Sequence, residues 1–426
     1  MADGGASAKG KPAKLKDILG PGLITGASDD DPSGIATYSQ AGAGYGFALG
    51  WTLILTYPLM VAVQMISARI GRTTGRGIAG NLRRFCPRWL LIAIILPLLI
   101  ANTLNLGADL GAMADATALV TGWPGHLFLP AFALFCALTQ VFMSYKLYVR
   151  LLTWLTLALF AYVITLFLVH VPWGAALASL VVPHVSWSSD YLMTVVAIFG
   201  TTISPYLFFW QASEEAEDIM QAPDRKALQD DPDEGPGELR RIELDTMAGM
   251  ALSNLVALSI LFTTAATLGA AGVTDIQTSA DAAAALRPIA GNHASILFAV
   301  GIVGTGLLAV PVLAGSAAYA IGEALAWPVG LDRRPLQAKA FYATIAAATL
   351  IGMTLNYLPI NPIKALFWTA VINGVVAVPV MAIMMILSQR RDVMGGFLVH
   401  GPLKWLGWIA TALMAVAVIA MGVTSL

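Results

Sequence analysis

Long apolar segments recur along the whole chain, with little polar sequence between them. A bilayer core about 30 Å thick is crossed by a helix of about 20 apolar residues, and eleven windows of this kind can be marked. They lie near residues 18–46, 48–70, 89–116, 121–143, 147–170, 189–219, 245–270, 294–324, 338–357, 362–387 and 402–424. Only 12% of the 426 residues are charged, against roughly one quarter in a soluble domain. The sequence therefore predicts an all-α polytopic membrane protein.

The basic residues fall on alternate loops, and this pattern predicts the orientation of the chain. Cytoplasmic loops collect Lys and Arg. With eleven spans, all but Arg287 and Lys364 of the 24 basic residues lie on one side. This places the N-terminus in the cytoplasm and the C-terminus outside, as expected for a bacterial inner-membrane protein. The formal net charge of −1 argues against nucleic acid as a partner. The expected partner is the lipid bilayer.

The chain is predicted to form one membrane domain over residues 18–426, after a cytoplasmic tail at 1–17. The stretch 221–244 is charged and contains Pro and Gly, so it cannot support a buried core, and we expect a cytoplasmic loop there. The Ala-rich stretch 271–293 is expected to form short helices outside. No Walker motif for ATP binding occurs, so any transport would draw on an ion gradient or the membrane potential.

Two of the spans contain helix-breaking residues near their middle. The first contains Pro32 within Gly26–Gly34, and the sixth contains Pro205 within Gly200–Tyr206. Proline removes a backbone donor and clashes with the preceding turn. Interrupted spans at corresponding positions indicate an inverted-repeat transporter with its substrate at the midplane. The two repeats would cover about 18–170 and 189–387, and the last span, 402–424, would be an addition.

The residues at the two breaks predict a cation site. An ionised carboxylate deep in a bilayer is costly and marks function by default, which makes Asp31 the first candidate. The backbone carbonyls of Ser28 and Thr201 should lose their helical donors beside it, and the Ser204 hydroxyl adds a further oxygen. Asp30 is a further candidate. Such oxygen ligands suit Mg²⁺, Ca²⁺ or Mn²⁺, carried as substrate, and no resident cofactor is expected.

Structural roles remain open for several of these side chains. Asp31 could cap the second half-helix, and the Ser204 hydroxyl could bond a carbonyl of its own helix. Asp109 and Asp115 are expected near the outer end of the third span, in packing or vestibule positions. Four acids after the second break are expected to form a solvated cytoplasmic face: Glu214, Glu215, Glu217 and Asp218.

The segment GPGLITGASDDDPSGIATYSQAGAGYGFALGW, residues 20–51, resembles the first span of the NRAMP divalent metal transporters. The similarity continues more loosely over nearly the whole chain. It implies a LeuT-like fold of five plus five helices with additions, and proton-coupled import of Mn²⁺ or Fe²⁺.

The family's metal-binding motifs are altered in this sequence. In the first span the family has Asp-Pro-Gly-Asn, where this chain has Asp31–Gly34, so the Asp is kept and Gly34 replaces the Asn ligand. In the sixth span Met-Pro-His corresponds to Ser204–Tyr206, so a hydroxyl replaces sulfur. In the tenth span the resemblance makes Thr369 and Asn373 candidate ligands. Losing a soft ligand weakens the preference for Mn²⁺ and Fe²⁺. Gly34 in place of Asn leaves space for water, and Mg²⁺ usually keeps several of its waters when bound.

The proton route that the family implies is altered as well. Its acidic Asp-Leu-x-Glu pattern corresponds to Asn105–Ala108, and its two sixth-span His residues correspond to Tyr206 and Gln211. Tyr206 is also a candidate metal contact. Together with the run ISPYLFFWQ at 203–211, these differences resemble the NRAMP-related magnesium transporter branch. The resemblance therefore implies import of Mg²⁺, and also Mn²⁺, without proton coupling.

Two other transport functions remain as alternatives. A proton-coupled Mn²⁺ or Fe²⁺ importer would need an acid such as Asp109 on the proton route. An amino-acid permease of the same fold would bind a carboxylate, which the cluster Asp29–Asp31 would repel. An enzyme is not expected, because no Ser/His/Asp set recurs among the spans.

The predicted orientation can be tested with a tag at each end of the chain. An impermeant reagent applied to intact cells should label the C-terminal tag only, because eleven spans place the two ends on opposite sides. Labelling of both tags from outside would make the span count wrong, and the repeat assignment would fail with it.

Overall fold

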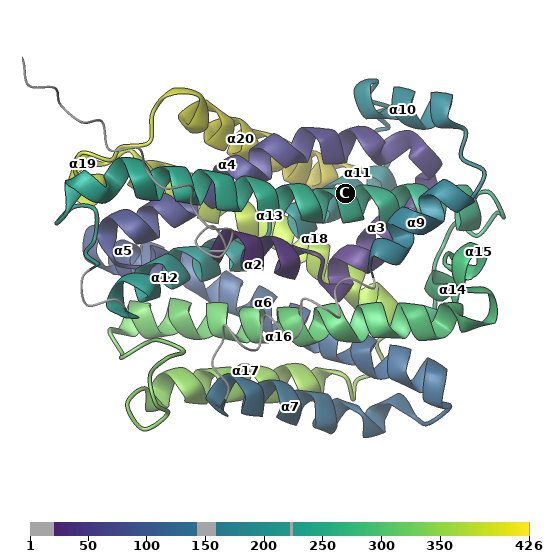
Figure 1. Cartoon of the computed structure of the whole chain (residues 1–426), viewed down its shortest axis with the longest axis horizontal. Coiled ribbons are helices and arrows are strands. Elements are labelled where there is room, and N and C mark those ends of the chain that lie inside the picture. The colour runs from purple at the N-terminus through teal and green to yellow at the C-terminus, as the bar shows by residue number, and fades with distance from the viewer. Residues whose placement is uncertain (1–20, 143–158, 222–224, 426) are drawn as a thin grey trace, which may run out of the picture.

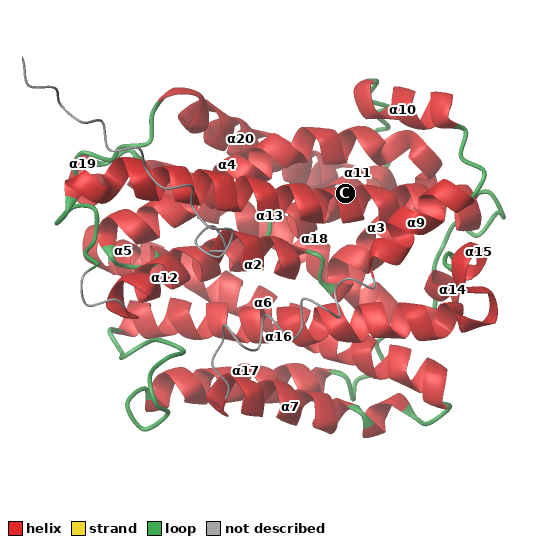
Figure 2. Ribbon diagram, viewed as in Figure 1, coloured by secondary structure: helices red, strands yellow, loops and turns green. Residues whose placement is uncertain are grey.

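The computed structural model describes residues 21–142, 159–221 and 225–425. These residues are almost entirely helical, and no strand occurs among them. Figure 2 shows the helices joined by short loops, and most of the long ones run along one common direction. Their order and bounds are α2 (Pro21–Asp29), α3 (Pro32–Tyr45), α4 (Gly50–Thr74), α5 (Ile78–Phe85), α6 (Arg88–Thr121), α7 (Leu129–Phe142), α9 (Phe160–Leu168), α10 (Trp173–Val181), α11 (Ser189–Thr202), α12 (Pro205–Gln221), α13 (Gly235–Thr264), α14 (Ser279–Ala284), α15 (Arg287–Ala290), α16 (Ala294–Leu325), α17 (Lys339–Leu355), α18 (Pro362–Ser388), α19 (Arg391–Met394) and α20 (Gly401–Thr424).

These helices account for the predicted spans. Within the described residues, eight continuous helical stretches are long and apolar enough to cross a membrane. One of them joins the second half of the first window to the second window through the short turn Gly46–Leu49. The ninth window forms α17, which has 17 residues and is slightly shorter than these eight stretches. Residues 147–158 of the fifth window lie outside the described residues. The polytopic all-helical fold is confirmed.

Both predicted interruptions are present. The first span divides into α2 and α3 around Asp30 and Asp31, and the sixth divides into α11 and α12 around Ile203 and Ser204. A proline is the first residue of each second half, where its missing N–H has no helical partner to lose. Figure 1 shows α2 near the middle of the molecule, packed against α13.

Glycines bring the broken helices into backbone contact with their neighbours. A Cβ on Gly26 of α2 would lie 2.3 Å from the carbonyl carbon of Gly249 in α13. A Cβ on Gly200 of α11 would lie 2.0 Å from the carbonyl oxygen of Ala370 in α18. Small residues at such crossings let membrane helices pack at close range. The half-helices α2 and α11 therefore pack closely against the long helices α13 and α18.

The structure agrees with the prediction for the polar stretch 271–293 and differs from it in part for 221–244. The outer stretch 271–293 contains the short helices α14 and α15, as expected. In the stretch 221–244 the loop is shorter than expected, because α13 already begins at Gly235. Arg72 of α4 explains this early start, since its buried guanidinium pairs with Glu234 at 2.7 Å and with Glu238 at 3.0 Å.

The glycine contacts predict a clear stability difference. Gly200→Ala should lower the free energy of unfolding by about 1–3 kcal/mol, because the added methyl group overpacks the contact with α18. Gly174→Ala is the matched control, since a Cβ on this helical glycine of α10 meets nothing within 4 Å. Thermal unfolding of both variants in detergent measures the difference. Equal melting temperatures would show that α11 and α18 do not pack this closely.

Candidate functional site

The two helix breaks meet inside the molecule. The Tyr206 hydroxyl, at the start of α12, donates to the backbone carbonyl of Ser28 at 3.0 Å. The same hydroxyl reaches Oδ2 of Asp31 at 3.3 Å. A Cβ on Gly34 of α3 would lie 3.1 Å from Oγ1 of Thr201 in α11. Residues from all four half-helices therefore surround one buried point, as the sequence predicted.

Asp31 is the best-connected side chain of this group. It is buried, with 2% of its surface exposed. Its Oδ1 accepts from the Ser33 hydroxyl and from the Gly34 backbone N–H, each at 2.7 Å. Its Oδ2 accepts from Nδ2 of Asn105 on α6 at 3.1 Å. Asp31 thus caps α3 with one oxygen and turns the other toward α6 and α12.

The two predicted carbonyl ligands already accept hydrogen bonds in this conformation. The Ser204 hydroxyl donates to the carbonyls of Gly200 and Thr201, at 2.7 and 2.8 Å. The Ser28 carbonyl accepts from Tyr206, as described above. The expectation that these carbonyls would be left free is therefore wrong, because side-chain hydroxyls donate to them. A carbonyl oxygen has two lone pairs, so each retains capacity for a cation.

Asp29 and Asp30 form a second carboxylate pair beside Asp31. The Ser253 hydroxyl of α13 is 2.5 Å from Oδ2 of Asp29 and 3.3 Å from Oδ1 of Asp30. Both Asp side chains are buried. No Lys or Arg forms a salt bridge with Asp29, Asp30 or Asp31 among the residues that the structure describes. The site is therefore rich in negative charge and suited to a cation.

Thr369 and Asn373, the candidates in α18, are not tied to the breaks. The Thr369 hydroxyl donates to the carbonyl of Leu366 in its own helix. Asn373 is buried, and neither of its side-chain polar atoms has a hydrogen-bond partner within the described residues. Asn373 thus retains ligand capacity, whereas no hydrogen bond links either residue to Asp31 among the described residues.

Three side chains around the site were not predicted to belong to it. Asn105, singled out only as a missing acid, donates to Asp31. Ser253 bonds Asp29 and Asp30 from α13. Asp109 lies one helical turn after Asn105, fully buried, and neither carboxylate oxygen has a partner in the described part of the chain. Of the packing and vestibule positions expected for Asp109, its burial fits a packing position. The spacing of four residues between Asn105 and Asp109 was the available signal.

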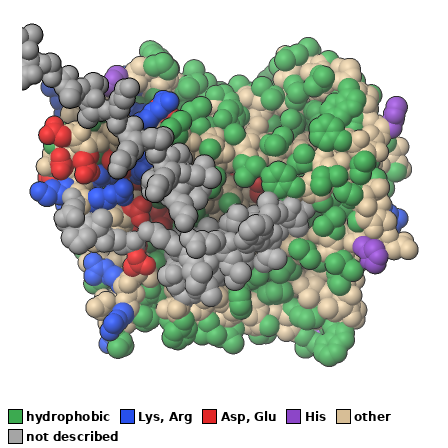
Figure 3. All heavy atoms as spheres, viewed as in Figure 1, with side chains coloured by type: hydrophobic (Ala, Val, Ile, Leu, Met, Phe, Trp, Pro, Cys, Tyr) green, Lys and Arg blue, Asp and Glu red, His purple; other side chains and the backbone are tan. Residues whose placement is uncertain are grey.

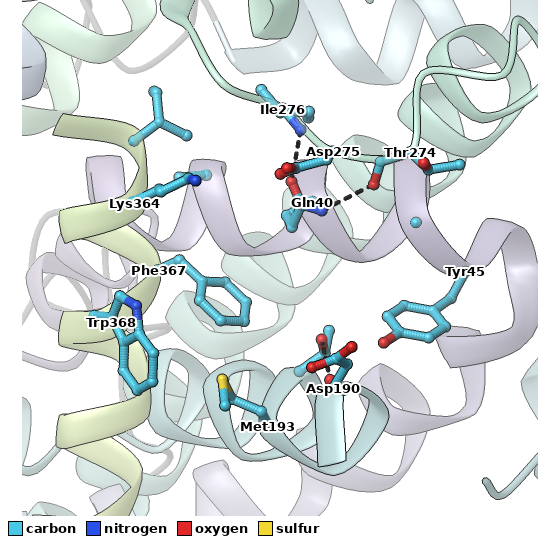
Figure 4. A pocket seen from close by; sticks show the side chains of 14 residues that line it. Gln40, Tyr45, Asp190, Met193, Thr274, Asp275, Ile276, Lys364, Phe367 and Trp368 are labelled. Carbon is cyan, nitrogen blue, oxygen red and sulfur yellow. Dashed lines mark hydrogen bonds between the residues drawn. The ribbon is translucent and has the colours of Figure 1, made fainter. Parts of the chain in front are cut away.

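A cavity of about 490 Å³ opens at the end of the molecule opposite the basic loops. It is lined by α3, α11, α18 and the loop at 274–276 (Figure 4). Asp190 and Lys364 stand at its polar rim, and Phe367 and Trp368 line its apolar wall. Gln40 holds the loop against α3 by bonds to the Thr274 carbonyl and the Ile276 N–H. Asp31 does not line this cavity, so the site is covered.

The opposite end is closed by carboxylates that accept bonds across helices. Asp245 of α13 accepts from the backbone N–H groups of Gly22 and Leu23, at 2.7 and 3.0 Å, and so caps α2. Glu323 of α16 accepts from the N–H groups of Gly77 and Gly80. Figure 3 shows charged side chains gathered at this end of the face in view. These contacts join α2 to α13, and α5 with the turn before it to α16, at this end.

The four acids that were expected to form a solvated cytoplasmic face lie at this end of the molecule. Glu215 is fully buried and pairs with Arg241 at 2.5 Å. Glu217 is also buried and accepts from the Tyr319 hydroxyl and from the backbone N–H of Asp332. The prediction of a solvated face is therefore wrong for these two residues, because α13 and α16 cover them.

The donor set limits how a metal could be held. No group of three or more His, Cys, Asp or Glu side chains suited to a metal occurs in the described residues. A cation at the breaks would therefore depend on Asp31 together with carbonyls, hydroxyls and retained waters. This set favours a hard, partly hydrated ion over one that needs sulfur or imidazole.

Comparison with known proteins identifies relatives of this chain. The divalent metal cation transporter MntH of Deinococcus radiodurans is 29% identical over 422 residues, covering 96% of this chain and 89% of the relative. The MntH of Mycobacterium tuberculosis strain H37Rv is 25% identical over 405 residues, covering 93% of this chain and 89% of its own.

Solved structures share the fold. A mutant of the manganese transporter of Eremococcus coleocola superposes with a TM-score of 0.72 at 18% identity, covering 97% of this chain and 88% of its own. MhsT, solved in complex with L-phenylalanine, gives a TM-score of 0.61 at 13% identity, covering 96% and 98%. The architecture is therefore the LeuT-like fold expected from the two broken helices.

A family model, natural resistance-associated macrophage protein-like, matches residues 22–424. Because that match leaves only the two ends of the chain uncovered, the protein is a member of the Nramp family.

Proposed function

We propose that this protein is a secondary transporter that imports divalent metal cations through the site at the two breaks. The observation that carries the proposal is Asp31, a buried carboxylate without a basic partner among the described residues, bonded to α3, α6 and α12. Relatives named as divalent metal cation transporters support the substrate class. The membership of this family also agrees with the expectation that the chain is not an enzyme.

Magnesium is the ion that the ligands favour, with Mn²⁺ as a second substrate. Among the described residues, the side chains that form hydrogen bonds at the breaks present oxygen and amide groups, and none of them is a thioether. Ser204 stands where the family's sulfur ligand is expected. We infer that the protein belongs to the magnesium branch of the family. Asp31, Ser28, Thr201 and Ser204 would supply its oxygens, with Tyr206, Gly34 and Asp30 beside them.

Transport would proceed from the open cavity toward the basic end. The cavity lies on the side that the charge pattern assigns to the exterior. The contacts of Asp245 and Glu323 close the side assigned to the cytoplasm. We infer that this conformation faces outward with its site covered. Release would require the contacts at the basic end to open.

Proton coupling is not part of the preferred mechanism. Asn105, Ala108, Tyr206 and Gln211 carry no group that exchanges a proton near neutral pH. Asp109 is the observation that favours the second candidate, a proton-coupled Mn²⁺ or Fe²⁺ importer. It is a buried carboxyl group without a hydrogen-bond partner in the described residues, one turn from Asn105. Proton exchange at Asp109 during transport would favour the second candidate.

Substitution of Asp31 can separate its capping role from its ligand role. Asn caps helices as well as Asp does, so Asp31→Asn should leave the melting temperature nearly unchanged. Its uptake of Mg²⁺ should fall at least tenfold, about 1.4 kcal/mol or more, because the charge is lost. Asp233→Asn, at an exposed position, is the control. Wild-type uptake by a folded Asp31→Asn protein would remove Asp31 from the site.

Selectivity and coupling are tested together in proteoliposomes that contain a pH reporter. Mg²⁺ should be carried, should compete with Mn²⁺, and should not acidify the lumen. Ser204→Met should shift preference toward Mn²⁺ through its thioether, whereas Ser204→Ala, which only removes the hydroxyl, should not. Gly34→Asn should weaken Mg²⁺ transport, since its Cβ would approach Oγ1 of Thr201 to 3.1 Å.

One result would decide for the second candidate. If Mn²⁺ entered with protons and Mg²⁺ were excluded, the magnesium assignment would be wrong. Acidification that disappears in Asp109→Asn would then identify Asp109 as the proton carrier.

A further inference from the structure

A groove of about 530 Å³ lies on the flank of the molecule between α6 and α16. Leu91, Ile95 and Leu99 of α6 form one apolar wall, and Ile321 and Leu325 of α16 form the other. Arg83, at the end of α5, and Arg88, the first residue of α6, line the same groove. The groove therefore combines an apolar length with a basic mouth.

The dimensions of the groove match one leaflet of a bilayer. The rise from Arg88 to Leu99 along α6 is about 16 Å at about 1.5 Å per residue. Half of a hydrocarbon core about 30 Å thick is about 15 Å. Trp89, which is 69% exposed, lies beside the basic mouth, as interfacial aromatic residues do. The two arginines thus lie at headgroup depth when the apolar walls face acyl chains.

The basic mouth is suited to a phosphate. Arg83 and Arg88 are exposed, and no acidic side chain lines the groove in the part of the chain that the structure describes. The guanidinium of Arg83 interacts electrostatically with Glu323. The Glu323 oxygens, however, already accept hydrogen bonds from Gly77, Gly80 and Ser213. The N-terminus of α6 adds unpaired N–H groups and the positive end of a long helix. Basic pockets between helices on the cytoplasmic side bind anionic lipid headgroups.

We propose that this groove binds an anionic phospholipid, with its phosphate at Arg83 and Arg88 and an acyl chain along α6 and α16. The bound lipid bridges α5, α6 and α16. Gly77 lies just before α5, Gly80 lies in α5, and both donate to Glu323 of α16 at the closed end. The same lipid would therefore span this contact between α5 and α16. The lipid therefore stabilises the closed basic end.

Native mass spectrometry of the full chain tests the headgroup contact. Protein released from micelles with equal phosphatidylglycerol and phosphatidylcholine should retain phosphatidylglycerol at least tenfold more. The variant Arg83→Gln/Arg88→Gln should lose this preference. The control Arg334→Gln/Arg391→Gln removes the same charge from exposed positions at the same end and should keep it. Equal retention of both lipids, or equal loss in both variants, would overturn the proposal.

A second variant tests the groove without altering its charge. Ala324→Trp fills the apolar part of the groove and leaves both arginines, so phosphatidylglycerol retention should fall at least fivefold. Phosphatidylglycerol should also raise the melting temperature of the wild-type protein and not that of Ala324→Trp. If glycerol phosphate, which lacks acyl chains, raised the melting temperature equally, the site would bind free phosphates and the lipid proposal would be wrong.

Discussion

The structure depends on how the two helix breaks satisfy their own backbone groups. In hydrocarbon no water is available to bond an exposed N–H or C=O, and each unpaired group costs several kcal/mol. Asp31 accepts from the Gly34 N–H, Ser204 donates to the Gly200 and Thr201 carbonyls, and Tyr206 donates to the Ser28 carbonyl. The groups that make the interruptions tolerable are therefore the same groups for which we propose a role in cation binding.

Capping α3 leaves Asp31 able to act as a ligand as well. Asp31 has two carboxylate oxygens, and only one is used fully by the start of α3. The other faces Asn105 and Tyr206, whose contacts at 3.1 and 3.3 Å are long for hydrogen bonds to a carboxylate. Loose contacts of this kind are inexpensive to exchange for an ion. A cation entering here would replace weak donors and leave the cap of α3 in place.

The two ends of the molecule are built from different interactions. At the basic end, Asp245 and Glu323 accept backbone N–H groups from α2 and from the turn before α5. At the other end, the neutral side chain of Gln40 bridges α3 to the loop at 274–276, beside an open cavity. Charged acceptors make stronger hydrogen bonds than neutral ones, so the basic end is the more firmly closed. A lipid across α5, α6 and α16 would add to this difference.

The sequence by itself determined the helical membrane fold, the two interruptions and the position of Asp31, because apolar periodicity, proline and buried charge are local signals. It could not determine that Asn105 and Ser253 complete the site, since they lie 74 and 224 residues from their partners. Nor could it show that Glu215 is buried, because burial depends on Arg241 of another helix. Those pairings follow from helix packing, which brings together side chains that carry no sequence signal of their proximity.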